Sequence, residues 1–448
     1  MILLFIISII ILLIINLLDA SYSTLVASLV VYIIGFIYSQ TTNNNHKRYS
    51  ISLFLIVISC YLISAYIFSL SFSNGNHFLL SDPLKYIDEF SANNVDGYKL
   101  DIYYIIDSYL VLSDDNVLHN FYIKFLSFFS KSLLDGGSIL FLTLAHSLFG
   151  ILSSTVLYRV LLMYFSSIKA FKYALIFSLL SVFHFYSGVI IRDIIIAYFY
   201  LLVIEIVLNK YSLKNLIKIF IILIITLGLR LYSGLFISVF ILFYIYIPFK
   251  KSRFKPLLMP LYILTIIALI SSLTLIIQKS IDELAFYQQF SLDRGKLSGG
   301  LSNYLLNLPI GLKQIVLTLY SQFNPFPPFA PLLSANTFSQ YYMSLLILIY
   351  SIWWAYIFFP LLILLLYKGA FKKITIEFKI LFFISIIFIT INTAHIDVRR
   401  IMPVYPILYL IFLQLKNNII PKFYMKRVNI VFTFFSILGL IVYIFLTA

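Results

Sequence analysis

Long apolar runs dominate this chain of 448 residues and limit what it can fold into. About 20 consecutive apolar residues form a helix that spans the roughly 30 Å hydrocarbon core of a bilayer. Apolar residues make up 62% of the chain and charged residues 11%, whereas soluble domains are about 45–50% apolar and about 25% charged. A soluble globule made from this sequence could not cover its surface with polar groups. The sequence therefore predicts an integral membrane protein.

The apolar runs predict an all-α polytopic protein with about 13 transmembrane helices (range about 11–14) in one membrane domain, residues 1–448. The runs cover residues 2–18, 23–40, 51–72, 138–163, 173–190, 194–209, 212–229, 231–248, 257–277, 342–366, 379–394, 401–415 and 429–447. The first run lacks a basic region and a small-residue cleavage site, so we interpret it as a retained helix. The single cysteine, Cys60, excludes a disulfide framework.

The distribution of charge predicts the orientation of these helices. With the N-terminus in the cytoplasm, the inner loops hold 19 of the 32 lysines and arginines, and 15 of the 17 acidic residues fall outside. Cytoplasmic loops are enriched in lysine and arginine. We therefore expect a multi-pass protein with a cytoplasmic N-terminus. The basic residues are dispersed between apolar runs, so the net charge of +15 predicts no nucleic-acid partner.

Two long segments are expected on the outer face, residues 73–137 and 278–341. The first carries nine carboxylates among aromatic and apolar patches. The second contains an amphipathic stretch at residues 301–320 and a proline cluster at residues 325–328. Such mixtures are typical of short helices that lie on the membrane or cap a cavity.

Four arginines break the orientation rule because they lie in short outer turns: Arg192, Arg230, Arg399 and Arg400. A guanidinium stays charged and can bind phosphate oxygens in a bidentate fork. We expect these arginines to form one site for a lipid-linked phosphate or diphosphate. The structural alternative is that Arg192 pairs with Asp193, that Arg399 pairs with Asp397, or that the arginines reach the membrane interface.

Transfer onto a sugar hydroxyl needs a general base, and a carboxylate can serve. The candidates are Asp193 and Asp397, beside the arginines, and Asp82, where the first long segment leaves the membrane. His395, close to Asp397, is a further candidate base. His146 and His184 lie within predicted spans and are interpreted as buried, hydrogen-bonded residues. The sequence predicts no cofactor, although its acidic pairs leave room for a divalent metal.

The order of short motifs resembles the bacterial polysaccharide polymerases of the Wzy type. The matching elements are Ser187-Gly188 with Arg192-Asp193, then Arg230, then residues 324–328, and last Arg399-Arg400 with Pro403 and Pro406. These elements span most of the chain, but each is short and degenerate. The repeated arginine-to-glycine spacing found in two periplasmic loops of some such polymerases is not present. The resemblance therefore does not assign donor and acceptor to particular loops.

The resemblance implies a GT-C-like helical membrane fold in the bacterial inner membrane, with the active site facing the periplasm. Donor and acceptor would be undecaprenyl-diphosphate oligosaccharides, joined into O-antigen or capsular polysaccharide, and a chain-length regulator protein would be a further partner. Arg192, Arg230 and Arg399 or Arg400 would hold the donor diphosphate. Asp193 or Asp82 would accept the proton of the attacking hydroxyl.

Three alternatives stay open. A GT-C glycosyltransferase that adds a single sugar from a polyprenyl-phosphate donor would use the same arginines. A flippase or other transporter of lipid-linked oligosaccharides generally needs basic residues inside a central cavity and has short loops, and here the mid-span charges are few. A structural membrane scaffold fits the composition but leaves the arginine turns unexplained.

Overall fold

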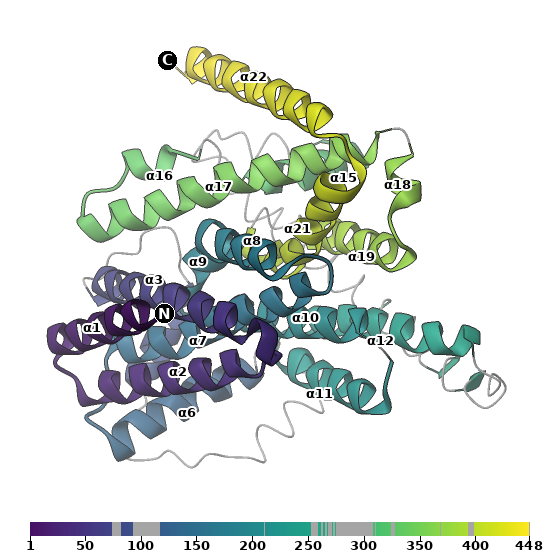
Figure 1. Ribbon diagram of the computed structural model, residues 1–448. Coiled ribbons are helices and arrows are strands. Elements are labelled where there is room, and N and C mark those ends of the chain that lie inside the picture. Colours follow the sequence, from purple (N-terminus) through teal and green to yellow (C-terminus); the bar gives the residue numbers. More distant parts are fainter. Residues whose placement is uncertain are drawn as a thin grey trace. The chain divides into compact units, whose positions relative to one another are not determined.

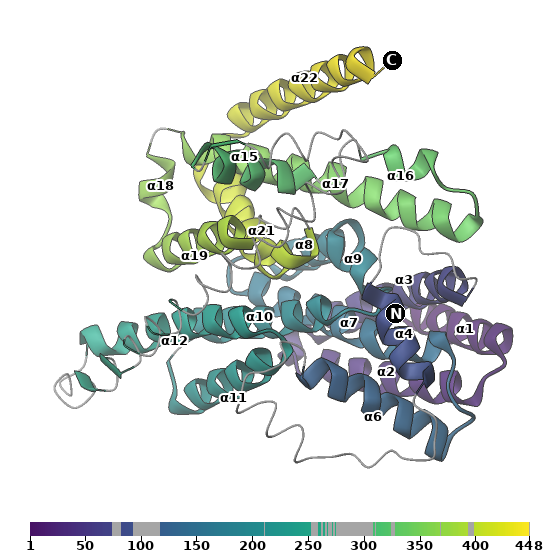
Figure 2. The ribbon, with the colours of Figure 1, turned by 180° about the vertical axis from the view of Figure 1, so that it is seen from behind.

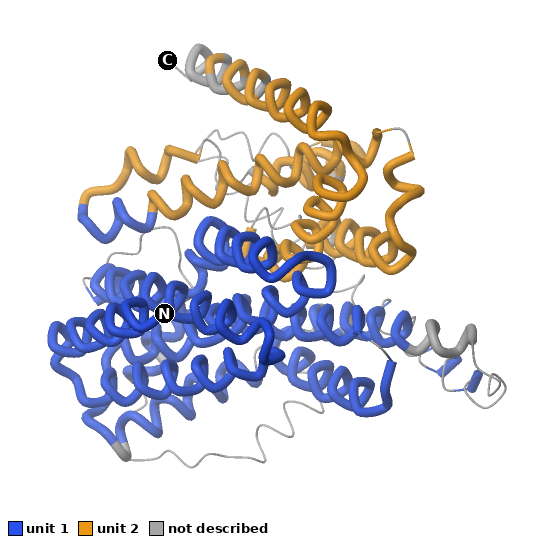
Figure 3. The backbone as a smooth tube through the Cα atoms, in the orientation of Figure 1, with its two compact units in different colours: residues 1–277, 337–343 blue, residues 278–336, 344–448 orange. Residues whose placement is uncertain are grey.

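The computed structural model divides the chain into two compact units, each described by itself (Figure 3). Unit 1 comprises residues 1–277 and 337–343, and unit 2 comprises residues 278–336 and 344–448. The described residues are 1–73, 82–92, 117–209, 211–251, 308–309, 311–323, 328–367, 369–392 and 398–447, with scattered positions between 259 and 274. Every regular element in these ranges is helical, as the sequence predicts.

Unit 1 is a bundle of mostly long helices. They are α1 (Ile2–Asp19), α2 (Tyr22–Gln40), α3 (Lys47–Ser73), α4 (Asp82–Ala92), α6 (Val117–Leu133), α7 (Ile139–Leu162), α8 (Ser167–Leu180), α9 (Val182–Ser187), α10 (Arg192–Leu208), α11 (Leu213–Leu229) and α12 (Leu231–Lys251). Helices α1, α2, α3 and α7 lie side by side (Figures 1 and 2).

Helix α7 lies at the centre of unit 1. It packs against α2, α3, α8, α9 and α10, and 83% of its most apolar window is buried. The corresponding window of α1 is only 17% buried, although α1 is the more apolar helix. A helix that exposes most of an apolar surface needs an apolar solvent. Helix α1 therefore has the properties of a lipid-facing helix, and α7 those of a core helix.

Two glycines allow α9 and the residues after it to approach the core closely. A Cβ atom on Gly150 of α7 would lie 1.8 Å from Oγ of Ser187, and a Cβ atom on Gly188 would lie 2.5 Å from the Phe68 ring. Neither position can hold a larger residue without moving its neighbour. The absence of a side chain thus lets the start of the Arg192 turn pack directly on α3 and α7.

The predicted span at residues 173–190 is not one helix, which corrects the sequence interpretation. Helix α8 ends at Leu180, and Ser181 is extended and caps α9 through a bond from the Phe183 N–H. Side chains compensate for the break: the Tyr61 hydroxyl donates to the Ser178 carbonyl (2.8 Å), and His184 Nδ1 donates to the Leu179 carbonyl (3.0 Å). Away from water, a broken helix requires such partners for its freed backbone groups.

Polar contacts join helix ends at one side of unit 1. The Asp135 carboxylate accepts hydrogen bonds from the backbone N–H groups of Tyr22 (2.6 Å) and Ser23 (3.1 Å), at the start of α2. Ser138, which caps α7, donates to Asp19 at the end of α1 (2.9 Å). Both turns are expected on the outer face, so the contacts agree with the predicted alternation of these helices.

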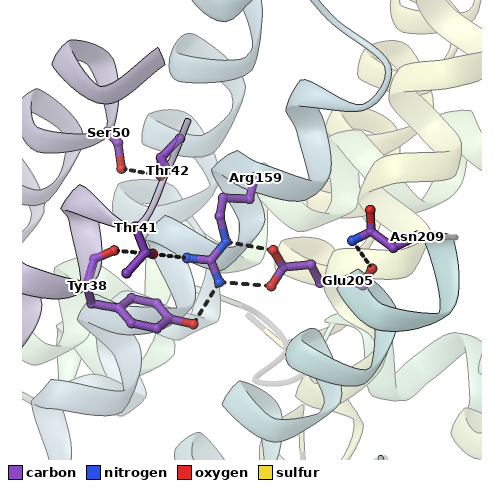
Figure 4. A network of polar contacts seen from close by, with 7 residues as sticks. All are labelled: Tyr38, Thr41, Thr42, Ser50, Arg159, Glu205 and Asn209. Atoms are coloured by element: carbon purple, nitrogen blue, oxygen red, sulfur yellow. Dashed lines mark hydrogen bonds and ion pairs between the residues drawn. The ribbon is translucent and has the colours of Figure 1, made fainter. Parts of the chain in front are cut away.

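A second network joins helix ends at the opposite side (Figure 4). Arg159, near the end of α7, forms a bidentate ion pair with Glu205 of α10. Its Nε donates to Oε1 at 2.6 Å and its Nη2 donates to Oε2 at 2.8 Å. Its guanidinium also donates to the Tyr38 hydroxyl (2.7 Å) and to Thr41 Oγ1 (3.3 Å) at the end of α2. These residues belong to the side expected to face the cytoplasm. The identity of that side stays a prediction.

Unit 2 is also helical. It contains α15 (Leu312–Tyr320), α16 (Ala330–Leu333), most of α17 (Phe338–Leu365), α18 (Ala370–Lys373), α19 (Ile376–Asn392), α20 (Val398–Ile401), α21 (Tyr405–Gln414) and α22 (Lys422–Thr447). Its core includes Trp354, which stacks on Tyr405 with ring centroids 3.7 Å apart. The Trp354 indole N–H donates to Gln322 Oε1 (2.9 Å), which ties α17 to the turn after α15.

Six described helical stretches are long and apolar enough to cross a membrane: α1, α2, residues 44–73, α7, α17 and residues 398–419. The total of 13 spans and the GT-C-like arrangement stay predictions. The expected span at residues 257–277 lies largely outside the described residues. Helices α4 and α6 fall within the first predicted outer segment, and α15 and α16 within the second.

Candidate functional site

An ion pair buried in unit 1 joins two of the turns singled out by the sequence. The Arg230 guanidinium Nη1 contacts Oδ1 of Asp193. Asp193 lies in the first turn of α10, and Arg230 lies between α11 and α12. The two residues are only 2% and 3% exposed. A buried carboxylate–guanidinium pair is stable only when each charge compensates the other, so this contact fixes the two turns together.

Arg192 lies at the same place. It is the first residue of α10 and is partly exposed, and its Nη1 donates to the Leu229 carbonyl at 3.1 Å. This bond holds its guanidinium beside the end of α11, one residue from Arg230. The structure therefore brings Arg192, Asp193 and Arg230 together, and the prediction that they form one anion site stays a prediction.

A pair of buried histidines lies near these charges. His119 of α6 and His146 of α7 are both fully buried, and their Nε2 atoms are 3.1 Å apart. Burial, followed by the positive charges of Arg192 and Arg230, holds the pKa of His119 well below its usual range. His119 is therefore neutral at physiological pH, and it lies within the electrostatic reach of both arginines.

The cluster is recessed below the end of α7. His146 follows the first residue of α7, Ile139, by a distance of about 10 Å along the helix, at about 1.5 Å per residue. Helices α10 and α11 have 17 residues each and α7 has 24. Arg230, which follows α11, is buried, and the Tyr122 hydroxyl of α6 donates to the Ala145 carbonyl of α7 (3.0 Å).

The other predicted site residues lie elsewhere or outside the described part of the chain. Arg399 and Arg400 lie on α20 of unit 2, so their participation in the site of unit 1 stays a prediction. Asp82 begins α4. His395 and Asp397 lie outside the described residues. Among the residues that are described, no group of three histidine, cysteine or acidic side chains is placed to bind a metal.

His119 is the residue that the sequence interpretation missed. It lies in the first predicted outer segment, among nine carboxylates. The available signal was its spacing: His119 and Tyr122 are three residues apart on α6, and they meet His146 and Phe149, also three apart, on α7. Residues three apart share one helix face, so two such pairs indicate two helices that pack face to face.

The site is a set of two arginines and one carboxylate at the start of α10 and just before α12, with a buried histidine pair near them. Such a set can bind an anion and accept a proton. Comparison of the chain with protein-family models, curated proteins and solved structures finds no match.

Proposed function

We propose that the chain is a membrane glycosyltransferase that joins undecaprenyl-diphosphate-linked oligosaccharide repeat units into O-antigen or capsular polysaccharide, at the periplasmic face of the bacterial inner membrane. The observation that supports the proposal most is the meeting of Arg192 and Arg230 beside Asp193. Two guanidinium groups from separate hairpins are suited to a diphosphate, which has several anionic oxygens in a small volume.

In the proposed reaction the two arginines hold the donor diphosphate. They stabilise the negative charge that develops on it as the bond to the anomeric carbon breaks. Arg399 and Arg400 are further candidates for the same role. Groups that are already fixed before the reaction cost little reorganisation energy, and the Leu229 carbonyl and Asp193 fix Arg192 and Arg230 in this way.

Asp193 has a different role in this mechanism from the one the sequence predicts. Its carboxylate contacts Arg230 and is 2% exposed. A nearby positive charge favours the ionised form of a carboxylate and makes it a poorer proton acceptor. We assign Asp193 the task of positioning Arg230. The proton acceptor is then another group, with Asp82, His395 and Asp397 as the candidates from the sequence.

The glycan ladder of a deletion strain tests the proposal. The strain should display a single repeat unit, and the wild-type chain should restore long polymer. The Arg192→Ala variant should enter the membrane in normal amount but leave only single repeats. Long polymer in the deletion strain, or in every arginine variant, would contradict the proposal. A one-sugar extension by the purified protein from a polyprenyl-phosphate monosaccharide would instead support the alternative of a single-sugar glycosyltransferase.

Transport of a lipid-linked oligosaccharide is a second candidate. The observation that favours it is the break between α8 and α9, because broken helices line substrate paths in many transporters. The same deletion strain separates the two functions. Loss of a flippase removes all surface repeats, whereas loss of a polymerase leaves one.

A further inference from the structure

The hydrogen bonds of the histidine pair determine which nitrogen of each ring carries a proton. His146 Nδ1 lies 2.9 Å from the Leu142 carbonyl, which can only accept, so His146 Nδ1 carries the hydrogen. In a neutral ring, His146 Nε2 is then an acceptor. His119 Nε2, 3.1 Å away, must donate to it. This leaves His119 Nδ1 as an unprotonated acceptor.

His119 Nδ1 is buried and has no hydrogen-bond partner in the described part of the chain. A buried acceptor without a partner destabilises the fold relative to a satisfied one, so packing alone does not account for this nitrogen. Fixed as an acceptor by a chain of two hydrogen bonds, this nitrogen is suited to an incoming O–H group. The nearby arginines are suited to an anion.

Resting on the function proposed above, we propose that His119 Nδ1 is the proton acceptor for the attacking hydroxyl of the acceptor oligosaccharide. The hydroxyl oxygen forms a bond to the anomeric carbon of the donor, and the bond from that carbon to the diphosphate oxygen breaks. The hydroxyl proton moves to His119 Nδ1, and the lipid diphosphate leaves with the electron pair, held by Arg192 and Arg230. His146 is a positioning residue, because it acts on the reaction only through His119 Nε2.

Binding of the donor diphosphate is expected to raise the pKa of His119. Without a ligand, burial and neighbouring positive charge disfavour protonation of His119. A bound diphosphate compensates the charges of Arg192 and Arg230, so the pKa of His119 rises in the complex. The imidazole thus becomes a better proton acceptor only when the donor is in place. The rings of Tyr86 of α4 and Tyr122 of α6 contact the histidine pair. The charges that act on His119 are those of Arg192 and of Arg230, which is paired with Asp193.

Access to His119 requires a movement of α4. The Tyr86 ring meets His119 edge to face, with centroids 4.4 Å apart, and the histidine is fully buried. Helix α4 has 11 residues and packs on α6. It is the element that can carry Tyr86 away when the acceptor enters.

The His119→Gln variant separates catalysis from packing. The glutamine amide lies near the position of Nε2 and can still donate to His146, but it offers nothing at the position of Nδ1. If His119 only holds α6 against α7, this variant should work normally. If His119 is the base, elongation in membrane vesicles should slow by about 10²–10⁴-fold. His184→Gln is the matched control, because that buried histidine bonds to Ser64 and Leu179, and its elongation rate should stay within about threefold of wild type, far less than the effect of a lost base.

Binding of undecaprenyl diphosphate to the full chain in nanodiscs distinguishes failure of this inference from failure of the proposed function. Wild type and His119→Gln should bind the lipid equally, and Arg192→Ala should bind it more weakly. Normal elongation by His119→Gln would overturn the role of His119 and leave the proposed function standing. Absence of lipid binding by the wild-type chain would overturn both.

The pH dependence of the wild-type chain provides a test that does not depend on whether a variant folds. Elongation should fall at low pH, because a protonated His119 cannot accept a proton. The fall in kcat should occur at higher pH than the fall in kcat/KM, since kcat reports the complex and kcat/KM the free enzyme. A rate that does not fall at low pH, or identical profiles for both parameters, would contradict the proposal.

Discussion

Helix α10 carries an arginine–carboxylate pair at each end, and the two pairs differ in surroundings. Asp193 and Glu205 lie about 18 Å apart along the helix, at about 1.5 Å per residue. The Arg159–Glu205 pair is a bidentate fork with side chains 17% exposed, extended by Tyr38 and Thr41 (Figure 4). The Arg230–Asp193 pair has side chains 4% and 2% exposed, lies beside Arg192 and is within electrostatic reach of His119.

The comparison shows that an ion pair alone does not indicate a site. The fork of Arg159 connects the ends of α2, α7 and α10, and its contacts account for it as a structural clamp. Around Asp193, by contrast, a second guanidinium and a neutral histidine with an open acceptor lie together. Helix packing accounts for the ion pair at Asp193, but it does not account for the additional guanidinium or for the histidine acceptor.

The largest difference between the two ion pairs is expected when both members of each pair are replaced by apolar residues. Apolar replacement of a whole buried pair is often neutral for stability, whereas removal of one partner costs about 3–5 kcal/mol. Asp193→Leu with Arg230→Met should therefore fold but abolish long polymer. Glu205→Leu with Arg159→Met should retain long polymer. The glycan ladder and the thermal unfolding of both double variants are the measurements, and an inactive Arg159–Glu205 variant that folds normally would remove the distinction between the two ends.

Loss of Arg192 alone should have the next largest effect. Arg192→Ala removes one charge-stabilising group and should lower the elongation rate by about 10²–10³-fold. Because Arg192 is partly exposed, the unfolding temperature should change little. Arg192→Lys keeps the charge but not the fork, and its rate should fall between those of wild type and alanine. A rate for Arg192→Lys no better than for alanine would show that the fork, and not the charge, is the required property.

Removal of the Arg159 guanidinium alone should affect stability and not catalysis. Arg159→Met leaves Glu205 without its bidentate partner, and the cost should be on the order of 1–2 kcal/mol, below that of a fully buried pair because solvent reaches both groups. The elongation rate should stay within about twofold of wild type, since no charge-stabilising group is lost. Chemical denaturation in detergent and the vesicle assay measure the two quantities, and a rate lower by more than tenfold at unchanged stability would assign Arg159 to the site.

The smallest effect is expected at Asp135, in a turn predicted to lie on the outer face. Desolvation acts to raise the pKa of Asp135, but hydrogen bonds from residues 21–23 outweigh it and lower the pKa. A carboxylate whose pKa is lowered by folding stabilises the protein fully above its unfolded pKa of about 3.9, and this contribution is lost as pH falls through the folded value. Asp135→Asn should therefore lower the unfolding temperature slightly at pH 7, and the difference from wild type should shrink below about pH 4. A difference independent of pH would contradict this origin.

The sequence was sufficient for features that depend on local composition. The ends of α1, α2 and α7 fall within one residue of the predicted spans. A long apolar run forms a helix over its whole length when it crosses a membrane, so the ends of the run predict the ends of the helix. The meeting of Arg192 with Arg230 follows from hairpin geometry. Helices α10 and α11 have equal lengths, so the end of α11, with Arg230, lies level with the start of α10, with Arg192.

Features that depend on tertiary contacts were beyond the sequence. The break at Ser181 interrupts a mostly apolar run, and it is stabilised by Tyr61, a residue more than 100 positions away in the chain. The pairing of Asp193 with Arg230, 37 residues further along the chain, depends on how α10 and α11 face each other. The role of His119 depends on the open acceptor, which only the full set of hydrogen bonds reveals.

The binding of undecaprenyl diphosphate to the two double variants in nanodiscs tests the central claim most directly. The claim is that the arginines beside Asp193 form a diphosphate site and that the Arg159–Glu205 clamp does not. We predict that Glu205→Leu with Arg159→Met binds the lipid as wild type does, and that Asp193→Leu with Arg230→Met loses at least tenfold in affinity. Equal affinity of both variants, each folded normally, would contradict the claim.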